Sequence, residues 1–211
     1  MPKKRGHKSI PLKPYLHIYC EGEKTEPNYI RSYIETRFPG TRLSPVRSTR
    51  KNTPVQLVEE AIKAKRDTEN RPIDDVFWVV FDREAVNQYP DALHAKARQL
   101  AKVNGIHIAF SNVCFEVWLL LHFEKTTKAY ASYEDLRKQS LLRKHIPGYE
   151  KGTKHAFTKE QIATARANAK KMNKQTKAGA DRSWHEPYQW NPYTDVYKLL
   201  DAIDTFGAQE E

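Results

Sequence analysis

The sequence predicts an α/β protein in which helices flank a parallel sheet. Short strand-like apolar segments alternate with segments that repeat apolar residues at helical spacing. Residues 76–81 (VFWVVF) are apolar at every position, which is typical of a central parallel strand covered on both faces. The connections are short, so right-handed crossovers make a four-stranded parallel sheet the simplest topology.

Four segments are predicted as strands, and each is bounded by polar or turn residues. They cover residues 15–20, 42–47, 76–81 and 106–110. Pro45 limits the second segment to an edge or a broken strand.

Three helices are predicted between these strands. The first starts at Thr25 with a capping threonine and an early proline, and the second starts with the capping-box pattern of Thr53 and Gln56. The third covers Asp91–Asn104 and ends at Gly105.

Residues 111–123 (SNVCFEVWLLLHF) are apolar on nearly every side, which predicts a helix buried between other elements. Glu116 lies in its first turns. A buried carboxylate costs several kcal/mol unless it is paired or binds a cation, although it could also serve as a partner of the helix dipole.

The rest of the chain predicts a mainly helical C-terminal region. Helices are expected at residues 132–142 and 158–173 and after Asn191-Pro192, with loops at 143–157 and 174–190. We therefore expect a basic tail at residues 1–14, an α/β core at 15–125, and a basic helical region at 126–211 that packs on the core.

Composition excludes several classes of protein. Mean hydropathy is −0.79, and no apolar run approaches the roughly 20 residues of a membrane span. The basic N-terminal segment has no apolar run behind it, so we expect no secretory signal. The two cysteines, Cys20 and Cys114, lie in apolar segments and are expected to be reduced thiols in the cytoplasm.

The net charge of +10 is concentrated in one segment. Residues 137–182 hold 13 lysines and arginines against three acidic residues, and the remainder of the chain is balanced. This asymmetry favours a polyanionic partner such as nucleic acid, although a solvated lysine-rich helix is the simpler alternative.

Carboxylates follow two of the predicted strands. Glu21, Glu23 and Glu26 come after the first strand, and Asp82 and Glu84 come after the third. The carboxyl ends of parallel strands share one edge of a sheet, where α/β proteins bind ligands. Oxygen ligands suit Mg²⁺ or Mn²⁺, but the same residues could be solvated strand ends. The sequence has no P-loop and no zinc-ligand motif, which leaves this acidic group as the candidate site.

Four motifs, taken in order, resemble the RloB family. They are EGEKTEPNY at residues 21–29, FDRE at 81–84, the 111–123 segment, and NPYTDV at 191–196. The resemblance covers about residues 15–205 and implies a Toprim-like fold of alternating strands and helices. Val113 stands where the family often has proline.

The resemblance also implies roles for individual residues. Glu21, which precedes a glycine after the first strand, would be the general acid/base, and Asp82 and Glu84 would bind Mg²⁺ or Mn²⁺ with it. Glu84 replaces the usual aspartate. Glu116 would be a further catalytic residue, as a ligand or as a group that orients one.

We therefore expect a metal-dependent nuclease that hydrolyses DNA or a structured RNA such as tRNA, in phage defence or abortive infection. A non-catalytic nucleic-acid binder and a regulatory subunit of an ATPase-containing defence complex are the alternatives. The residues expected to contact phosphates are Lys24, Lys151, Lys154, Arg166, Lys170, Lys171 and Lys174. Trp184, Tyr188, Trp190 and Tyr193 could stack on unpaired bases, but closing a small core against the last helix is the favoured interpretation.

Overall fold

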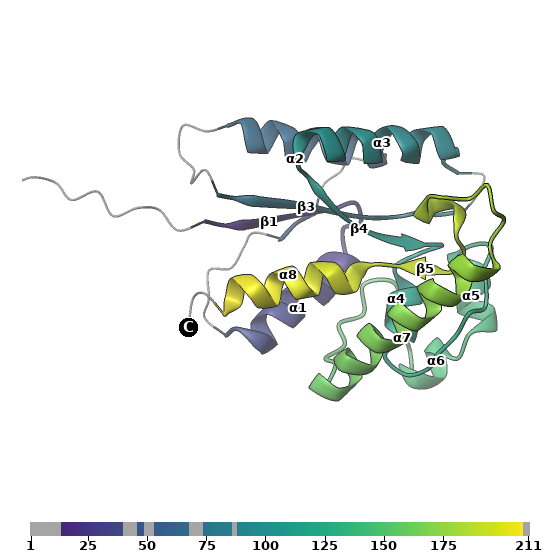
Figure 1. Cartoon of the computed structure of the whole chain (residues 1–211). Coiled ribbons are helices and arrows are strands. Elements are labelled where there is room, and N and C mark those ends of the chain that lie inside the picture. The colour runs from purple at the N-terminus through teal and green to yellow at the C-terminus, as the bar shows by residue number, and fades with distance from the viewer. Residues whose placement is uncertain (1–13, 40–45, 49–52, 68–73, 86–87, 209–211) are drawn as a thin grey trace, which may run out of the picture.

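The computed structural model describes residues 14–39, 46–48, 53–67, 74–85 and 88–208 (Figure 1). Most of the predicted N-terminal tail and most of the predicted 42–47 strand lie outside these residues. The elements are β1 (Leu16–Cys20), α1 (Thr25–Arg37), β2 (Val46–Ser48), α2 (Pro54–Arg66), β3 (Val76–Asp82), α3 (Asp91–Asn104), β4 (His107–Asn112), α4 (Glu116–Leu120), α5 (Tyr133–Gln139), α6 (Leu142–His145), α7 (Lys159–Gly179), the 3₁₀ helix η1 (Pro187–Gln189), β5 (Tyr193–Thr194) and α8 (Val196–Gly207).

The sheet has five strands in the order β2-β1-β3-β4-β5. The four predicted strands pair in parallel, and β5 adds an antiparallel edge next to Ser111 and Asn112. The prediction of a four-stranded, wholly parallel sheet therefore missed a fifth, antiparallel strand. A strand of two residues has no alternating pattern to reveal it.

Helices cover both faces of the sheet. In Figure 1, α2 and α3 lie on one face, α1 and α8 lie on the other, and α4 to α7 gather at one end of that second layer. Side chains of β3 alternate between the two layers: Phe77, Val79 and Phe81 pack with the first, and Trp78 and Val80 with the second. Burial on both faces explains why this strand is apolar throughout.

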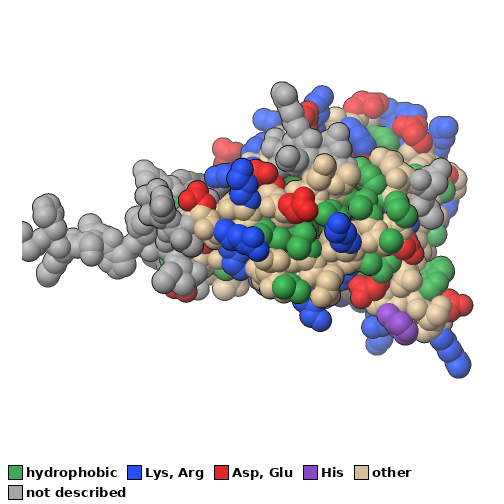
Figure 2. All heavy atoms as spheres, turned by 90° about the horizontal axis from the view of Figure 1, so that it is seen from above, with side chains coloured by type: hydrophobic (Ala, Val, Ile, Leu, Met, Phe, Trp, Pro, Cys, Tyr) green, Lys and Arg blue, Asp and Glu red, His purple; other side chains and the backbone are tan. Residues whose placement is uncertain are grey.

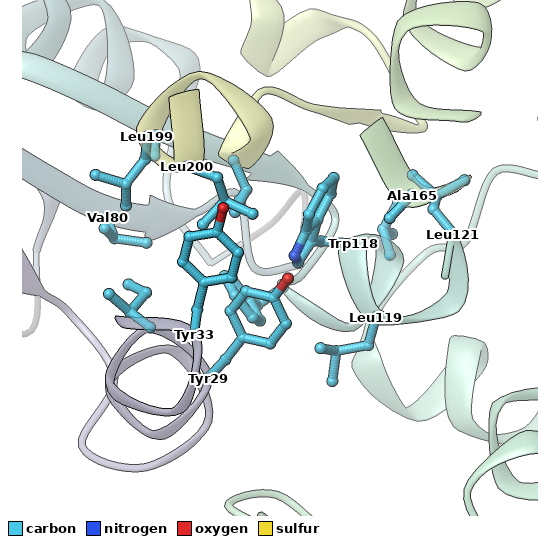
Figure 3. Packing of buried hydrophobic residues seen from close by; sticks show 14 of the residues in the cluster. Tyr29, Tyr33, Val80, Trp118, Leu119, Leu121, Ala165, Leu199 and Leu200 are labelled. Atoms are coloured by element: carbon cyan, nitrogen blue, oxygen red, sulfur yellow. The ribbon is translucent and has the colours of Figure 1, made fainter. Parts of the chain in front are cut away.

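The larger core lies under the second layer (Figure 3). Tyr29 and Tyr33 of α1 approach Trp118 of α4, with Leu199 and Leu200 of α8 and Ala165 of α7 around them. Strand β5 and helix α8 come after residue 125. The sheet and its core thus draw on both sides of the predicted domain boundary.

Several helices begin or end at residues other than those predicted from the sequence. The expected 111–123 helix is only α4, because Ser111 and Asn112 extend β4, and the Ser111 Oγ lies 2.9 Å from Thr194 Oγ1. Helix α7 runs to Gly179 instead of 173. The expected 132–142 helix ends at Gln139, and α6 falls mainly in a predicted loop.

Capping predictions hold for two helices and fail for one. Thr53 accepts the N–H of Gln56, and Gly105 ends α3 with a φ of 61°. Thr25, predicted as a cap, is instead the first residue of α1, and its side chain does not cap the helix. Both cysteines are buried and form no disulfide bond, as predicted. Among the described helices, none is both long and apolar enough to cross a membrane.

Asp195 fixes the edge of the sheet where β5 meets β4. Its N–H donates to the Phe110 carbonyl over 2.9 Å, and its Oδ1 accepts the Phe110 N–H over 2.7 Å. Its Oδ2 accepts the Tyr193 hydroxyl at 3.1 Å, and the side chain is buried.

We expect Asp195→Ala to lower the free energy of unfolding by about 2–3 kcal/mol, because the Phe110 N–H would be left buried without an acceptor. Asp195→Asn retains an acceptor oxygen and should cost less. Urea unfolding of the two variants measures the difference, and equal losses would contradict this role for the carboxylate.

Candidate functional site

An acidic cavity of about 470 Å³ lies beyond the ends of β1 and β3. The two strands are parallel neighbours, with Cys20 opposite Val80, and the Glu21 N–H donates to the Val80 carbonyl over 2.9 Å. Glu21 and Asp82 therefore leave the sheet at the same edge. The carboxylates that line the cavity are those of Glu21, Glu23, Glu26, Asp82, Glu84 and Glu116. The structure thus brings all four predicted catalytic residues to one cavity.

Asp82 is the last residue of β3 and is only 6% exposed. Its Oδ2 accepts the backbone N–H of Phe115 over 3.0 Å, which ties the strand end to the start of α4. Burial raises the pKa of Asp82 well above its usual range, and the charges of Glu84, Glu26 and Glu21 raise it further.

Glu21 and Glu26 also favour their protonated forms. Burial, followed by the charges of Glu84 and Glu26, raises the pKa of Glu21 from 4.5 to about 8. Burial is also the main cause that raises the pKa of Glu26 from 4.5 to about 7, with Glu116 and Glu84 adding to it. The cavity therefore contains more negative charge than its surroundings compensate.

Glu84 has a left-handed backbone, with a φ of 57°, which is uncommon for residues other than glycine. The preceding residue, Arg83, fixes this turn. Its backbone N–H donates to the Ser111 carbonyl over 2.8 Å, and its guanidinium forms an ion pair with Asp91 at 2.9 Å. Backbone strain of this kind often accompanies functional residues.

Glu116 is almost completely buried, at 1% exposed, at the start of α4. The Tyr149 hydroxyl donates to its Oε1 over 2.9 Å. The buried carboxylate therefore has the hydrogen-bonding partner that its burial requires, in addition to its place on the cavity wall.

Lys151 is the basic side chain from the C-terminal region that lines the cavity. Burial acts to lower its pKa, but the combined charges of Glu116, Asp82 and Glu84 outweigh burial and raise it. Its Nζ also lies 4.6 Å from the centre of the Tyr133 ring. Lys151 thus supplies positive charge to a site that is otherwise strongly acidic.

Gly152 anchors the Lys151 loop to the start of α1. Its N–H donates to Thr25 Oγ1, and its carbonyl accepts the Asn28 side-chain amide, both over 3.1 Å. Its φ is 90°, and a Cβ at this position would lie 2.8 Å from the Cβ of Lys24. A glycine is therefore required both by the backbone and by the close approach of Lys24.

The cavity suits a divalent cation in the chemistry of its ligands, but it is not a preassembled metal centre. Carboxylate oxygens are the ligands that Mg²⁺ and Mn²⁺ prefer, and the raised pKa values of Glu21, Glu26 and Asp82 indicate charge that a cation would neutralise. Within the described residues, no three Asp, Glu, His or Cys side chains are grouped as metal ligands.

The residues expected to contact phosphates are divided between three environments. Lys24 and Lys151 line the cavity, and Lys154 lies nearby on the same loop. Lys170, Lys171 and Lys174 are exposed on α7. Arg166 is instead paired with Asp201 and Asp204, each at 2.7 Å, so a phosphate would have to compete with two carboxylates.

The sequence did not single out Tyr149 or Gly152, and Glu26 was noted as acidic without a catalytic role. Glu26 lies in the first turn of α1, and a side chain at Gly22 would collide with its carboxylate. The contacts of Tyr149 and Gly152 join parts of the chain more than 30 and 120 residues apart, and no local pattern encodes them.

Comparisons with known proteins support one assignment. The family model of RloB-like proteins matches residues 16–203. No curated protein and no solved structure matches the chain significantly.

The raised carboxylate pKa values predict that stability depends on pH when no divalent cation is present. Between about pH 5 and pH 8 the folded protein retains protons on Glu21 and Glu26 that the unfolded chain has released, so stability should fall as pH rises through this range. Glu21→Gln is neutral at every pH and should flatten this fall. Melting temperatures in a chelator across this range test the prediction, with Glu59→Gln on α2 as the control. Parallel curves for Glu21→Gln and the parent would contradict it.

Gly152→Ala tests the anchoring of the Lys151 loop. The new Cβ would collide with Lys24, which should displace Lys151 and weaken binding of phosphate-containing ligands. Gly148→Ala is the matched control, because Gly148 also has a positive φ, of 72°, but nothing lies within 4 Å of the added Cβ. Both variants should lose about 1 kcal/mol of stability or somewhat more from the strained backbone. Binding that falls equally in both variants would exclude a specific role for the loop.

Proposed function

The chain belongs to the RloB-like protein family, and from that premise and its acidic cavity we propose that it is a metal-dependent nuclease that hydrolyses nucleic-acid phosphodiester bonds. The observation that carries the proposal is the group of carboxylates with raised pKa values that line one cavity at the ends of β1 and β3, with Lys151 among them. Such perturbed groups in one cavity are typical of catalytic sites.

The proposal includes a Toprim-type arrangement of the sheet. In support, the sheet is mostly parallel, and its acidic residues follow the first and third strands. These are the positions to which the resemblance to the RloB family assigns Toprim-type roles.

We assign separate roles to the carboxylates. Asp82, Glu84 and Glu26 would hold Mg²⁺ or Mn²⁺, and Glu116, fixed by Tyr149, would orient the ligands or join them. The cation would polarise the scissile phosphate and neutralise charge on the leaving oxygen. Glu21, whose pKa of about 8 lies near neutral pH, is suited to transfer the proton or to share the cation.

Lys151 and Lys24 would bind the phosphate that enters the cavity. Both line its wall, and their positive charges oppose the repulsion between a phosphate and the carboxylates. The Gly152 anchor holds Lys151 in place without using the lysine side chain itself.

The nucleic acid would extend from the cavity along the basic C-terminal region. Exposed lysines on α7 provide the sequence-independent electrostatic contacts that such binding requires. The face formed by α2 and α3 is a poor alternative, since basic, acidic and apolar side chains are mixed there (Figure 2).

The biological setting follows from the family resemblance. We propose a role in phage defence or abortive infection, with DNA or a structured RNA such as tRNA as substrate and an ATPase as a partner protein. The buried thiols of Cys20 and Cys114, which form no disulfide bond, fit a protein that works in the reducing cytoplasm.

Asp82→Asn separates an enzyme from a binding protein. The substitution keeps the shape of the side chain but removes the carboxylate that would ionise to hold the cation, so Mn²⁺-dependent cleavage of cellular RNA or plasmid DNA should fall by orders of magnitude, while binding persists. Relief of carboxylate repulsion should leave the melting temperature in a chelator unchanged or higher. Glu59→Gln, on the surface of α2, serves as the control and should retain activity.

Two other results would redirect the assignment. A folded Asp82→Asn protein that cuts at the parent rate would exclude this cavity as the nuclease site. Loss of stability together with activity would make Asp82 a structural residue, and the nucleic-acid binder or the ATPase-associated regulatory subunit would then be the better description.

A further inference from the structure

Trp184 differs from the other three tryptophans of the chain in its exposure. Its side chain is 45% exposed, whereas Trp78, Trp118 and Trp190 are 6%, 0% and 7% exposed. Trp190 and Tyr193 belong to the core under α2 and α3, and Tyr188 packs against it. Of the four aromatic residues considered for base stacking, three thus serve mainly to close a core, and Trp184 presents its indole to solvent.

The backbone that carries Trp184 is held in a defined turn. The Trp184 N–H donates to the Asp181 carbonyl over 2.9 Å, and the Asp181 carboxylate accepts the N–H and hydroxyl of Ser183 at 2.8 and 2.6 Å. The Trp190 indole N–H donates to the Trp184 carbonyl over 3.4 Å. An aromatic ring on an ordered turn loses little conformational freedom when a ligand stacks on it.

Basic side chains outnumber acidic ones along residues 174–186, where Asp181 and Glu186 are the acidic residues. Lys174, Lys177 and Arg182 are exposed at the end of α7 and in the following turn. The Lys177 Nζ lies 5.2 Å from the centre of the Trp190 ring, beside the Trp184 backbone. The nearby Glu186 is paired with Arg98 at 2.9 Å, which offsets its negative charge.

We propose that Trp184 stacks on an unpaired nucleobase, and that Lys174, Lys177 and Arg182 bind the phosphates on either side of it. The inference rests on the proposed function, because it adds single-stranded nucleic acid as the ligand class of the proposed nuclease. A planar apolar ring among lysines and arginines matches a base flanked by phosphates, and stacking of this kind tolerates any base sequence. Bases inside a duplex are already stacked and cannot reach the ring.

Intrinsic fluorescence provides a direct test with the full chain in a chelator, where metal-dependent cleavage cannot occur. Single-stranded RNA, single-stranded DNA and duplex DNA of equal length are titrated against the parent protein. Single-stranded RNA, single-stranded DNA or both should quench the fluorescence of the accessible tryptophan. A difference in affinity between the RNA and the DNA identifies the preferred sugar. Duplex DNA should quench much less.

Variants assign the signal to Trp184. Trp184→Ala should lose the quenching and weaken single-strand binding by about 5- to 100-fold, with little effect on duplex binding. Trp184→Phe should recover most of the affinity, because phenylalanine also stacks. Val103→Ala on α3, which removes another exposed apolar side chain, is the control and should bind like the parent.

Replacing Lys170, Lys171 and Lys174 by glutamine should weaken binding of single strands and duplex alike and reduce its salt dependence, while the quenching at saturation remains.

Unchanged single-strand affinity in Trp184→Ala, or an equal loss of duplex affinity in that variant, would overturn the stacking proposal. Neither result bears on whether Asp82→Asn abolishes cleavage, so failure of the stacking proposal is distinguishable from failure of the nuclease proposal.

Discussion

Repulsion among buried carboxylates is the constraint on which this structure depends. Glu21, Glu26 and Asp82 all have raised pKa values, because each loses solvent and faces other negative charges across the same cavity. Such a grouping opposes folding unless protons, lysine or a bound cation compensate it. Contacts from neighbouring residues hold these carboxylates in place around the cavity.

Two of those contacts join parts of the chain that are 33 residues apart, and a third is local. The N–H of Phe115 holds Asp82, the hydroxyl of Tyr149 holds Glu116, and the guanidinium of Arg83 secures the turn that presents Glu84. The Asp82 and Glu116 carboxylates thus each have a hydrogen-bond donor of their own. These hydrogen bonds and the ion pair hold part of the acidic cavity in place in the absence of a ligand.

The sequence predicted the features that local patterns encode. The apolar run that ends at Asp82 identified both the central strand and its acidic terminus, and the capping pattern of Thr53 located the start of α2. The sequence could not reveal β5, which has two residues, or the contact of Gly152 with Thr25, which exists only after the chain has folded. Charge alone also could not distinguish Arg166, paired with Asp201 and Asp204, from the exposed lysines of α7.

The packing of the second layer has a consequence for how the protein can be divided. The core beneath it combines Tyr29 and Trp118 with Ala165 and Leu200, so the first half of the chain cannot bury its apolar surface without α7 and α8. A fragment that stops near residue 125 would also expose the edge of β4 and leave the acidic cavity without Lys151. The acidic site and the basic helix α7 therefore share one hydrophobic core, and a cut between them would disrupt both.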